Sequence, residues 1–235
     1  MTGLPLSVEA RDLAFTFRQR HSLFRHTHHK AIDGISFSVR SGETLGVIGA
    51  NGCGKSTLLK IIAGIYSPDA GEMKRHCQKI SLLSLALGFD PDLSGIDNAL
   101  ISGMFLGARR AEVQAKIPEI IEFAEIGDFV YQPIKTYSTG MRARLAFSVA
   151  LTMHTDLLLI DEVMGVGDAR FREKAEKAMI ERIESDQTVI LVSHSEPQIK
   201  RLCDRVMWLD KGKVKQCGNP DEVLAAYNRF NHANG

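Results

Sequence analysis

The segment GANGCGKST, at Gly49–Thr57, constrains the fold more than any other part of this chain. It matches the pattern G-x-x-x-x-G-K-[ST], a loop whose backbone N–H groups can surround a phosphate, and that pattern needs a strand before it and a helix after it. Both are indicated, because the buried-strand pattern TLGVIG precedes the loop and the apolar helix pattern KSTLLKIIAG follows it, closed by Gly64. This context argues against the alternative of a simple glycine-rich turn.

The loop predicts where a nucleotide is held. Its glycines let the backbone curl around a β-phosphate, Lys55 supplies a positive charge, and the Ser56 hydroxyl can ligate Mg²⁺. The residues that we expect to contact a nucleotide here are Gly49, Asn51, Gly52, Cys53, Gly54, Lys55, Ser56 and Thr57.

Polar residues follow two further buried-strand patterns, DLLLIDE and TVILVSHS. The carboxyl ends of such strands form the edge where open α/β sheets bind ligands. We expect Asp161 to hold Mg²⁺, directly or through water, and Glu162 to polarise the water that attacks a γ-phosphate. Capping of the next helix is the alternative role for these acids. A lone histidine is more often structural, but the position of His194 on the same edge favours a γ-phosphate contact.

The remaining patterns predict an α/β chain with a helical insert. VEARDLAFTF and AIDGISFSV are typical of strands, separated by a polar loop at residues 18–30, and RVMWLD is typical of a buried strand. Residues 90–153 are mostly helical in pattern, and DARFREKAEKAMIERIES predicts one more helix. A chain of 235 residues can bury one large core with a smaller appended subdomain.

Composition argues against several classes of protein. The formal net charge is only +1, so we expect no nucleic-acid partner. No apolar run approaches the roughly 18 to 20 residues that span a bilayer, and the N-terminus lacks a signal-type apolar core, so a cytoplasmic protein is expected unless a partner holds it at a membrane. The four cysteines lack C-x-x-C spacing, which argues against a disulfide framework or a zinc site.

The loop at residues 18–30 is rich in basic residues and contains His26, His28 and His29. Their spacing fits no standard metal site and no fourth ligand is evident, so a solvated basic loop is the main reading. A second hypothesis places these side chains near lipid headgroups or a lipid-pyrophosphate carrier.

The turn YSTGM, at residues 137–141, leads into a helix pattern. Ser138 and Thr139 are good N-cap types, and a helix N-terminus can hold an anion because its first N–H groups are unpaired. The phosphate loop, helical insert, polar turn, acidic strand end and terminal histidine together resemble the ATP-binding cassette family. They occur in that family's order and at about its spacing, over nearly all of the chain.

The resemblance implies one ABC-type P-loop ATPase domain over residues 1–235, with ATP and Mg²⁺ as cofactors. It implies a RecA-like, parallel-sheet core with an antiparallel β subdomain at about residues 1–89 and 154–235. A helical subdomain that carries the signature motif would occupy about residues 90–153.

The turn occupies the place of the family signature, usually Leu-Ser-Gly-Gly-Gln, and retains Ser138 and Gly140. By resemblance, Ser138, Thr139 and Gly140 contact the γ-phosphate of a nucleotide bound to a second copy, so that a homodimer encloses two ATP molecules. Asp168 matches the loop that crosses this interface, although an N-cap role suits it equally.

Phe17 is the first choice for the aromatic residue that stacks on adenine, and Phe15 is the second. Alternation places both on one strand face, and either can be a core residue instead. The chain departs from the family between the phosphate loop and the helical subdomain, where ISLLSLALGFDPDLSG contains no glutamine. Ser84 stands near the expected position, and we assign it no role.

Three segments, YSTGMRARLAFSVA, LIDEVMGVGDARF and GFDPDLSGIDNA, are similar to the cassette ATPases of bacterial polysaccharide export. That group moves capsular polymers, O-antigen chains or teichoic acids. The similarity implies a peripheral subunit at the cytoplasmic face of the inner membrane, attached to a dimeric integral membrane permease. It also implies contact with the polysaccharide or its lipid carrier. Residues 88–107 are the expected docking surface.

The sequence leaves other functions open. Another cargo, such as a lipid or a drug, is the main alternative, followed by a soluble cassette ATPase that acts on DNA or ribosomes and by a small-molecule P-loop kinase. Many relatives carry a C-terminal carbohydrate-binding domain, and since this chain stops soon after PDEVLAAYNRF we expect that function to be absent or supplied elsewhere.

Overall fold

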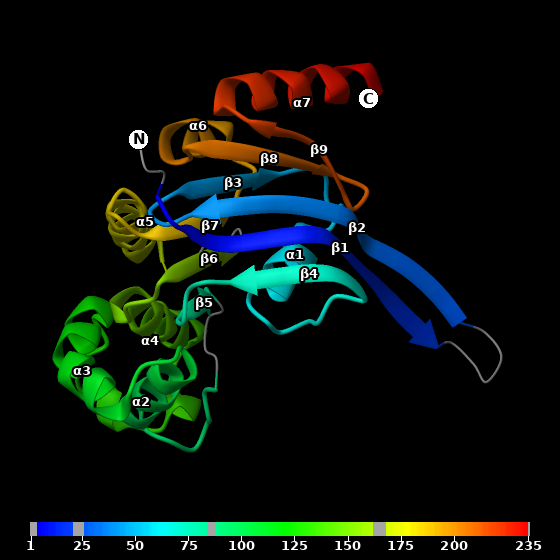
Figure 1. The fold of residues 1–235 in the computed structure, drawn as a ribbon. Coiled ribbons are helices and arrows are strands. Elements are labelled where there is room, and N and C mark those ends of the chain that lie inside the picture. Colours follow the sequence, from blue (N-terminus) through cyan, green and yellow to red (C-terminus); the bar gives the residue numbers. More distant parts are fainter. Residues whose placement is uncertain (1–3, 21–25, 84–87, 162–167, 235) are drawn as a thin grey trace. The chain divides into compact units, whose positions relative to one another are not determined.

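The computed structural model describes residues 4–20, 26–83, 88–161 and 168–234 (Figure 1). The chain divides into two compact units. Unit 1 comprises Met1–Gln78, Leu157–Glu162 and Ile183–Gly235, and unit 2 comprises Lys79–Asp156 and Val163–Arg182.

A mostly parallel sheet forms the centre of unit 1. Its strands are β3 (Thr44–Ile48), β6 (Leu157–Asp161), β7 (Thr188–Val192), β8 (Arg205–Asp210) and β9 (Lys213–Gly218). Their order is β6-β7-β3-β8-β9, and only the β8–β9 pair of these is antiparallel. Every residue of β3 and β7 is buried. The prediction of strands buried on both faces is therefore confirmed.

Three helices accompany this sheet in unit 1: α1 (Lys55–Ile62), α6 (Glu196–Leu202) and α7 (Pro220–Asn234). Gly64 has a φ of 78° just after the cap residue of α1, Ala63, which confirms the predicted C′ glycine. The aromatic rings of Tyr227 and Phe230 in α7 pack edge-on against Trp208 of β8, with centroid separations of 5.6 and 5.1 Å. These contacts hold α7 against the sheet (Figure 1).

A second sheet in unit 1 is antiparallel, in the order β2-β1-β4. It consists of β1 (Leu6–Arg20), β2 (His26–Arg40) and β4 (Ala70–Arg75). The sequence-based prediction of a loop across residues 18–30 was wrong at both ends, because β1 and β2 stay paired as far as Arg20 and His26. This two-stranded ribbon runs on beyond β4 (Figure 1). Its residues from 27 to 30 are all exposed, so no apolar alternation marked them as strand.

Unit 2 is mainly helical. Its elements are the short strand β5 (Ile80–Leu82), the helices α2 (Gly95–Phe105), α3 (Arg110–Ala124) and α4 (Thr139–Thr152), two 3₁₀ turns, η1 (Gly127–Tyr131) and η2 (Ile134–Thr136), and the part of α5 (Ala169–Ile183) that ends at Arg182. Phe123, Phe147 and Phe171 pack together where α3, α4 and α5 meet, at centroid separations of 5.8 to 6.2 Å. Within the described residues, no helix combines the length and apolar character needed to cross a bilayer.

Candidate nucleotide-binding site

The loop between β3 and α1 can be traced only by glycine at two positions. Gly49 and Gly54 have φ values of 151° and 112°, which favour glycine over other residues. A Cβ atom at Gly49 would lie 2.2 Å from the carbonyl oxygen of Leu209, and one at Gly54 would lie 2.4 Å from that of Ala31. The loop is therefore closely surrounded by backbone, which fixes its course.

Lys55 is the first residue of α1, and its side chain folds back across the loop. The Nζ atom donates hydrogen bonds to the carbonyl oxygens of Gly49 at 2.7 Å and of Ala50 at 3.0 Å, and the side chain is buried. These contacts hold a positive charge inside the curl of the backbone. Because Gly54 caps α1, no side chain covers the first N–H groups of the helix, which suit an anion.

A cavity of about 270 Å³ opens beside this loop in unit 1. Its lining residues are Phe17, His29, Ala31, Asn51, Gly52, Gly54, Lys55, Ser56, Thr57 and Asp161. Most of these were candidate site residues from the sequence, and the fold brings them together from β1, the phosphate loop and the end of β6. His29 and Ala31 were not predicted as lining residues. Only the pairing of β1 with β2 places them here, and no local pattern signals that pairing.

Two further loop candidates lie around this cavity rather than on its wall. Cys53 is buried and lines a second cavity of about 270 Å³ next to the first, together with Asp210, Lys211 and Gly212. Gly49 acts through its carbonyl group, which holds the ammonium group of Lys55.

The structure separates the two phenylalanines proposed for base stacking. Phe17 is 38% exposed and lines the cavity. Phe15 is less exposed and stacks on Tyr66, with ring centroids 5.1 Å apart and an interplanar angle of 6°. Phe15 also supports Phe17 edge-on at 5.0 Å. This arrangement favours Phe17 for the nucleotide contact and Phe15 for packing.

The carboxyl ends of β6, β7 and β3 lie along one edge of the parallel sheet. Asp161 pairs with Val192 in register, and Val192 pairs with Val47, one residue before the end of β3. Half-buried Asp161 ends β6, and exposed His194 follows β7 by two residues. The edge position predicted for both residues is confirmed. Glu162 lies outside the described residues, as does Ser84.

In unit 2, Ser138 caps α4 as its residue type predicted. The Ser138 hydroxyl accepts a hydrogen bond from the backbone N–H of Met141 at 3.1 Å. Thr139 is the first residue of the helix and is exposed, and Gly140 is half-buried. The turn therefore presents a helix N-terminus with its first residues accessible.

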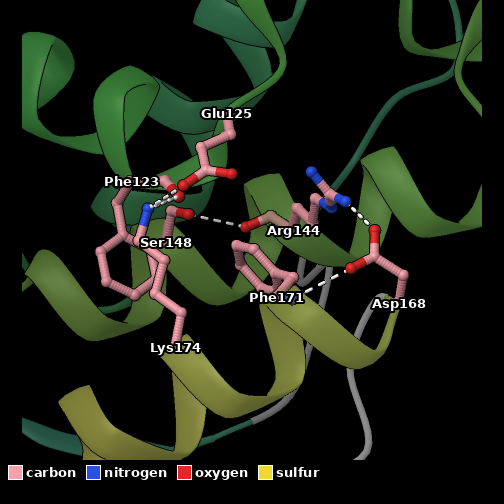
Figure 2. Close-up of polar contacts among 7 residues, drawn as sticks. All are labelled: Phe123, Glu125, Arg144, Ser148, Asp168, Phe171 and Lys174. Carbon is pink, nitrogen blue, oxygen red and sulfur yellow. Dashed lines mark hydrogen bonds and ion pairs between the residues drawn. The ribbon is translucent and has the colours of Figure 1, made fainter.

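Asp168 lies at the start of α5, where Figure 2 shows its carboxylate between two partners. It accepts a hydrogen bond from the backbone N–H of Phe171 at 3.0 Å and forms an ion pair with Arg144 of α4. The Phe171 N–H, with a smaller contribution from Arg144, lowers the pKa of Asp168. The capping role is therefore present in the structure. Arg144, for which no sequence pattern predicted a role, also lies over the ring of Phe171 at 5.2 Å.

Comparison with known proteins decides the family. The sequence pattern of the ABC transporter family matches residues 32–165, which is more than half of the chain. The chain belongs to the ABC transporter family. Two solved cassettes have the same fold at 21% sequence identity. One is an ATP-binding subunit of an ABC transporter, with a TM-score of 0.73 over 94% of this chain and 93% of that chain. The other is a dimeric cassette bound to ADP and Pi, with a TM-score of 0.70 over 91% and 98%.

Curated relatives of this ABC cassette are named as export proteins. The O-antigen export system ATP-binding protein of Klebsiella pneumoniae is 39% identical over 92% of this chain and 88% of its own length. The corresponding protein of Myxococcus xanthus is 46% identical over 84% of this chain and 45% of its own length. The teichoic acids export ATP-binding protein of Enterococcus faecalis is 43% identical over 86% and 45%. This chain thus spans about half the length of the last two relatives.

These comparisons confirm the resemblance stated from the sequence, the ABC-type α/β fold class and the assignment to an ATP-binding, ATPase family. The roles of individual residues in this ABC cassette stay predictions. Among the described residues, no group of three His, Cys, Asp or Glu side chains could hold a metal ion.

Proposed function

We propose that this chain is the ATP-hydrolysing subunit of an exporter that moves a surface polysaccharide across the bacterial inner membrane through a separate permease. The observation that carries the proposal is the cavity formed by the phosphate loop and Asp161, in a chain whose relatives are named for O-antigen and teichoic acid export. The same relatives support a polymer as cargo over the alternative of a lipid or a drug.

Within the cavity, each side chain has a proposed task. Lys55 neutralises charge on the β- and γ-phosphates, while the Ser56 hydroxyl and the Asp161 carboxylate supply oxygen ligands of the kind that Mg²⁺ prefers. Bound Mg²⁺ would stabilise the negative charge that develops on the phosphates. Glu162 would orient and polarise the attacking water, and His194 would contact the γ-phosphate.

We further propose that two copies of the chain complete two ATP sites. Ser138, Thr139 and Gly140 would contact the γ-phosphate of the nucleotide held by the other copy, and Asp168 would lie at the interface. The accessible N-terminus of α4 supports this role, and the dimeric cassettes of the same fold are consistent with it. ATP would favour the closed dimer because only that state provides these contacts, and hydrolysis would release it.

The permease would dock on residues 88–107 of the helical subdomain, which we place at about residues 90–153. Phe105 is 64% exposed and Met104 is 47% exposed. The loop before α2 is held by Asn98, whose side-chain amide donates to the carbonyl oxygens of Asp90, Leu93 and Ser94 at 2.9 to 3.0 Å. An ordered loop beside an exposed apolar end of a helix suits a docking surface.

A substitution tests this docking surface. Phe105→Asp should abolish co-purification of the permease and leave the thermal unfolding midpoint unchanged, because the ring is mostly exposed. Lys116→Asp, on the exposed side of α3, is the matched control. Recovery of the permease with the Phe105 variant would remove this surface from the proposal.

The function itself is tested in the organism. The gene is deleted and restored with wild type or with Glu162→Gln, and both surface polysaccharide and polymer retained inside the cell are measured. We expect polymer to leave the surface, to accumulate inside, and to return to the surface only with wild type. An unchanged surface in all strains, with no other cassette compensating, would mean that the cargo is wrong.

A further inference from the structure

Phe17 and His29 lie directly opposite each other in the β1–β2 ribbon. Opposite residues of an antiparallel pair project from the same face, with Cβ atoms about 5 Å apart. Both side chains are exposed and both line the cavity beside the phosphate loop. The ribbon therefore presents two aromatic rings, side by side, to the nucleotide cavity.

The position of this pair relative to the loop indicates which end of a nucleotide it meets. The carbonyl of Ala31 lies against Gly54, so the ribbon touches the phosphate loop at Ala31. His29 is two residues farther along β2, at most about 7 Å away along the strand. It lines the same cavity as Ala31. A nucleotide with its β-phosphate in the loop has its ribose and base beyond the phosphates, and Phe17 and His29 line the same cavity beyond the contact at Ala31.

The charges near His29 do not form a cationic site of the kind that binds phosphate. Lys30, next to it, forms an ion pair with Asp33. On the side of the second cavity, His29 shares the wall with Asp210 and Lys211, which have opposite charges. Lys55 already provides a buried positive charge at the loop. A ring that stacks on the base explains the position of His29 better than an added charge does.

Packing supports the other ring of the pair. Phe17 meets Phe15 and Tyr66 edge-on, at centroid separations of 5.0 and 5.9 Å, and those two rings stack on each other. The Phe17 ring is thereby held in place before a base arrives, which reduces the entropy lost on binding.

We propose that His29 is a nucleobase-binding residue that forms, with Phe17, a two-ring surface on which the base lies. This inference rests on the proposed binding of ATP. Stacking on a ring face does not read the edge of the base, so adenine and guanine should benefit equally. His29 should therefore contribute to the affinity for purine nucleotides without selecting between them.

The test measures dissociation constants by isothermal titration calorimetry for ATP, GTP and inorganic tripolyphosphate, which has no base. We expect His29→Ala to weaken ATP and GTP binding by a similar factor of about fivefold, at the low end for aromatic stacking. Tripolyphosphate binding should not change. His29→Phe should retain wild-type affinity for both nucleotides, because it keeps an aromatic ring and removes only the ring nitrogens.

His28→Ala is the matched control, since His28 is also exposed but alternates to the other face of β2. Unchanged ATP affinity in His29→Ala would overturn the inference. So would weaker tripolyphosphate binding that His29→Phe fails to restore, because that result indicates a phosphate contact. If the wild-type protein bound no ATP, the proposed function itself would be rejected. Thermal unfolding of each variant distinguishes loss of binding from loss of the fold.

Discussion

At the scale of single residues, the phosphate loop depends on backbone space as much as on charge. Gly52 and Gly54 both have positive φ values, 76° and 112°, but their surroundings differ. An added Cβ atom at Gly52 meets nothing within 4 Å, whereas at Gly54 it meets the carbonyl oxygen of Ala31 at 2.4 Å. A side chain at Gly52 would therefore meet conformational strain alone, whereas one at Gly54 would meet both strain and a steric clash.

We expect Gly52→Ala to lower the free energy of unfolding by about 1 kcal/mol, the cost of a left-handed conformation for a residue with a Cβ atom. Gly54→Ala should lower it by about 3 kcal/mol, because the backbone must also move. Urea denaturation of both variants measures the difference. Equal losses would show that the contact with Ala31 is relieved at no cost.

At the scale of elements, a charged side chain in unit 2 hydrogen-bonds the carbonyl groups at the end of a helix. The guanidinium group of Arg182 in α5 donates to the carbonyl oxygens of Ala150, Leu151 and Met153 at the end of α4. Ala150 and Leu151 belong to the last turn of α4, whose carbonyl groups have no partner within the helix, and Met153 is the cap residue. Arg182 therefore satisfies the end of α4 from a neighbouring element.

Arg182→Met should lower the free energy of unfolding by about 2–4 kcal/mol, since buried carbonyl groups lose charge-assisted hydrogen bonds. Arg201→Met is the control, because Arg201 is exposed and forms a surface ion pair with Glu184, typically contributing less than about 1 kcal/mol. Chemical denaturation of the two variants compares them. Similar small losses would mean that water replaces the guanidinium group at the helix end.

The start of α3 gives a prediction about pH. The Glu112 carboxylate accepts a hydrogen bond from the backbone N–H of Arg109 at 2.8 Å and another from the Arg109 guanidinium group. These contacts lower the pKa of Glu112 to about 2. A carboxylate whose pKa is lower in the folded state stabilises the fold above its unfolded pKa of 4.5, and this contribution is lost as pH falls toward 2.

The stability difference between wild type and Glu112→Gln should therefore be largest near pH 7 and shrink between pH 4.5 and 2. Thermal unfolding across this range measures it, with Glu119→Gln as the control on the exposed side of the same helix. A difference that does not vary with pH would contradict the assigned role of the carboxylate.

At the scale of the whole molecule, the proposed dimer predicts that ATPase activity requires the phosphate loop of one copy and the signature turn of the other. Lys55→Ala disables the phosphate loop and Ser138→Arg blocks the signature turn, so each variant alone should lack ATPase activity. In a mixed dimer, the intact loop of one copy meets the intact turn of the other. An equal mixture should recover about a quarter of wild-type activity, because half of the dimers are mixed and each has one complete site.

Steady-state ATP hydrolysis in the mixture measures this recovery, and circular dichroism shows whether Ser138→Arg leaves α4 folded. A mixture as inactive as its components would argue that the signature turn and the phosphate loop do not share a site.

Elements whose signals are local could be predicted from the sequence. The phosphate loop, the C′ glycine at Gly64, the N-cap at Ser138 and the buried strands each depend on residue types within a few positions of one another, and the order of these motifs indicated the family. The strand ends that carry Asp161 and His194 followed from the rule for parallel sheets.

Features that depend on pairing between distant segments could not be predicted from the sequence and emerged only from the fold. The register of β1 against β2 lengthened both strands and placed His29 beside Phe17. Phe15 stacks on Tyr66, whereas Phe17 meets that ring edge-on and lines the cavity. The ion pair of Asp168 with Arg144 joins the residue just before α5 to α4. Periodicity records which face of an element is buried, but it contains no information on which partner covers that face or at what register, and that partner sets these contacts.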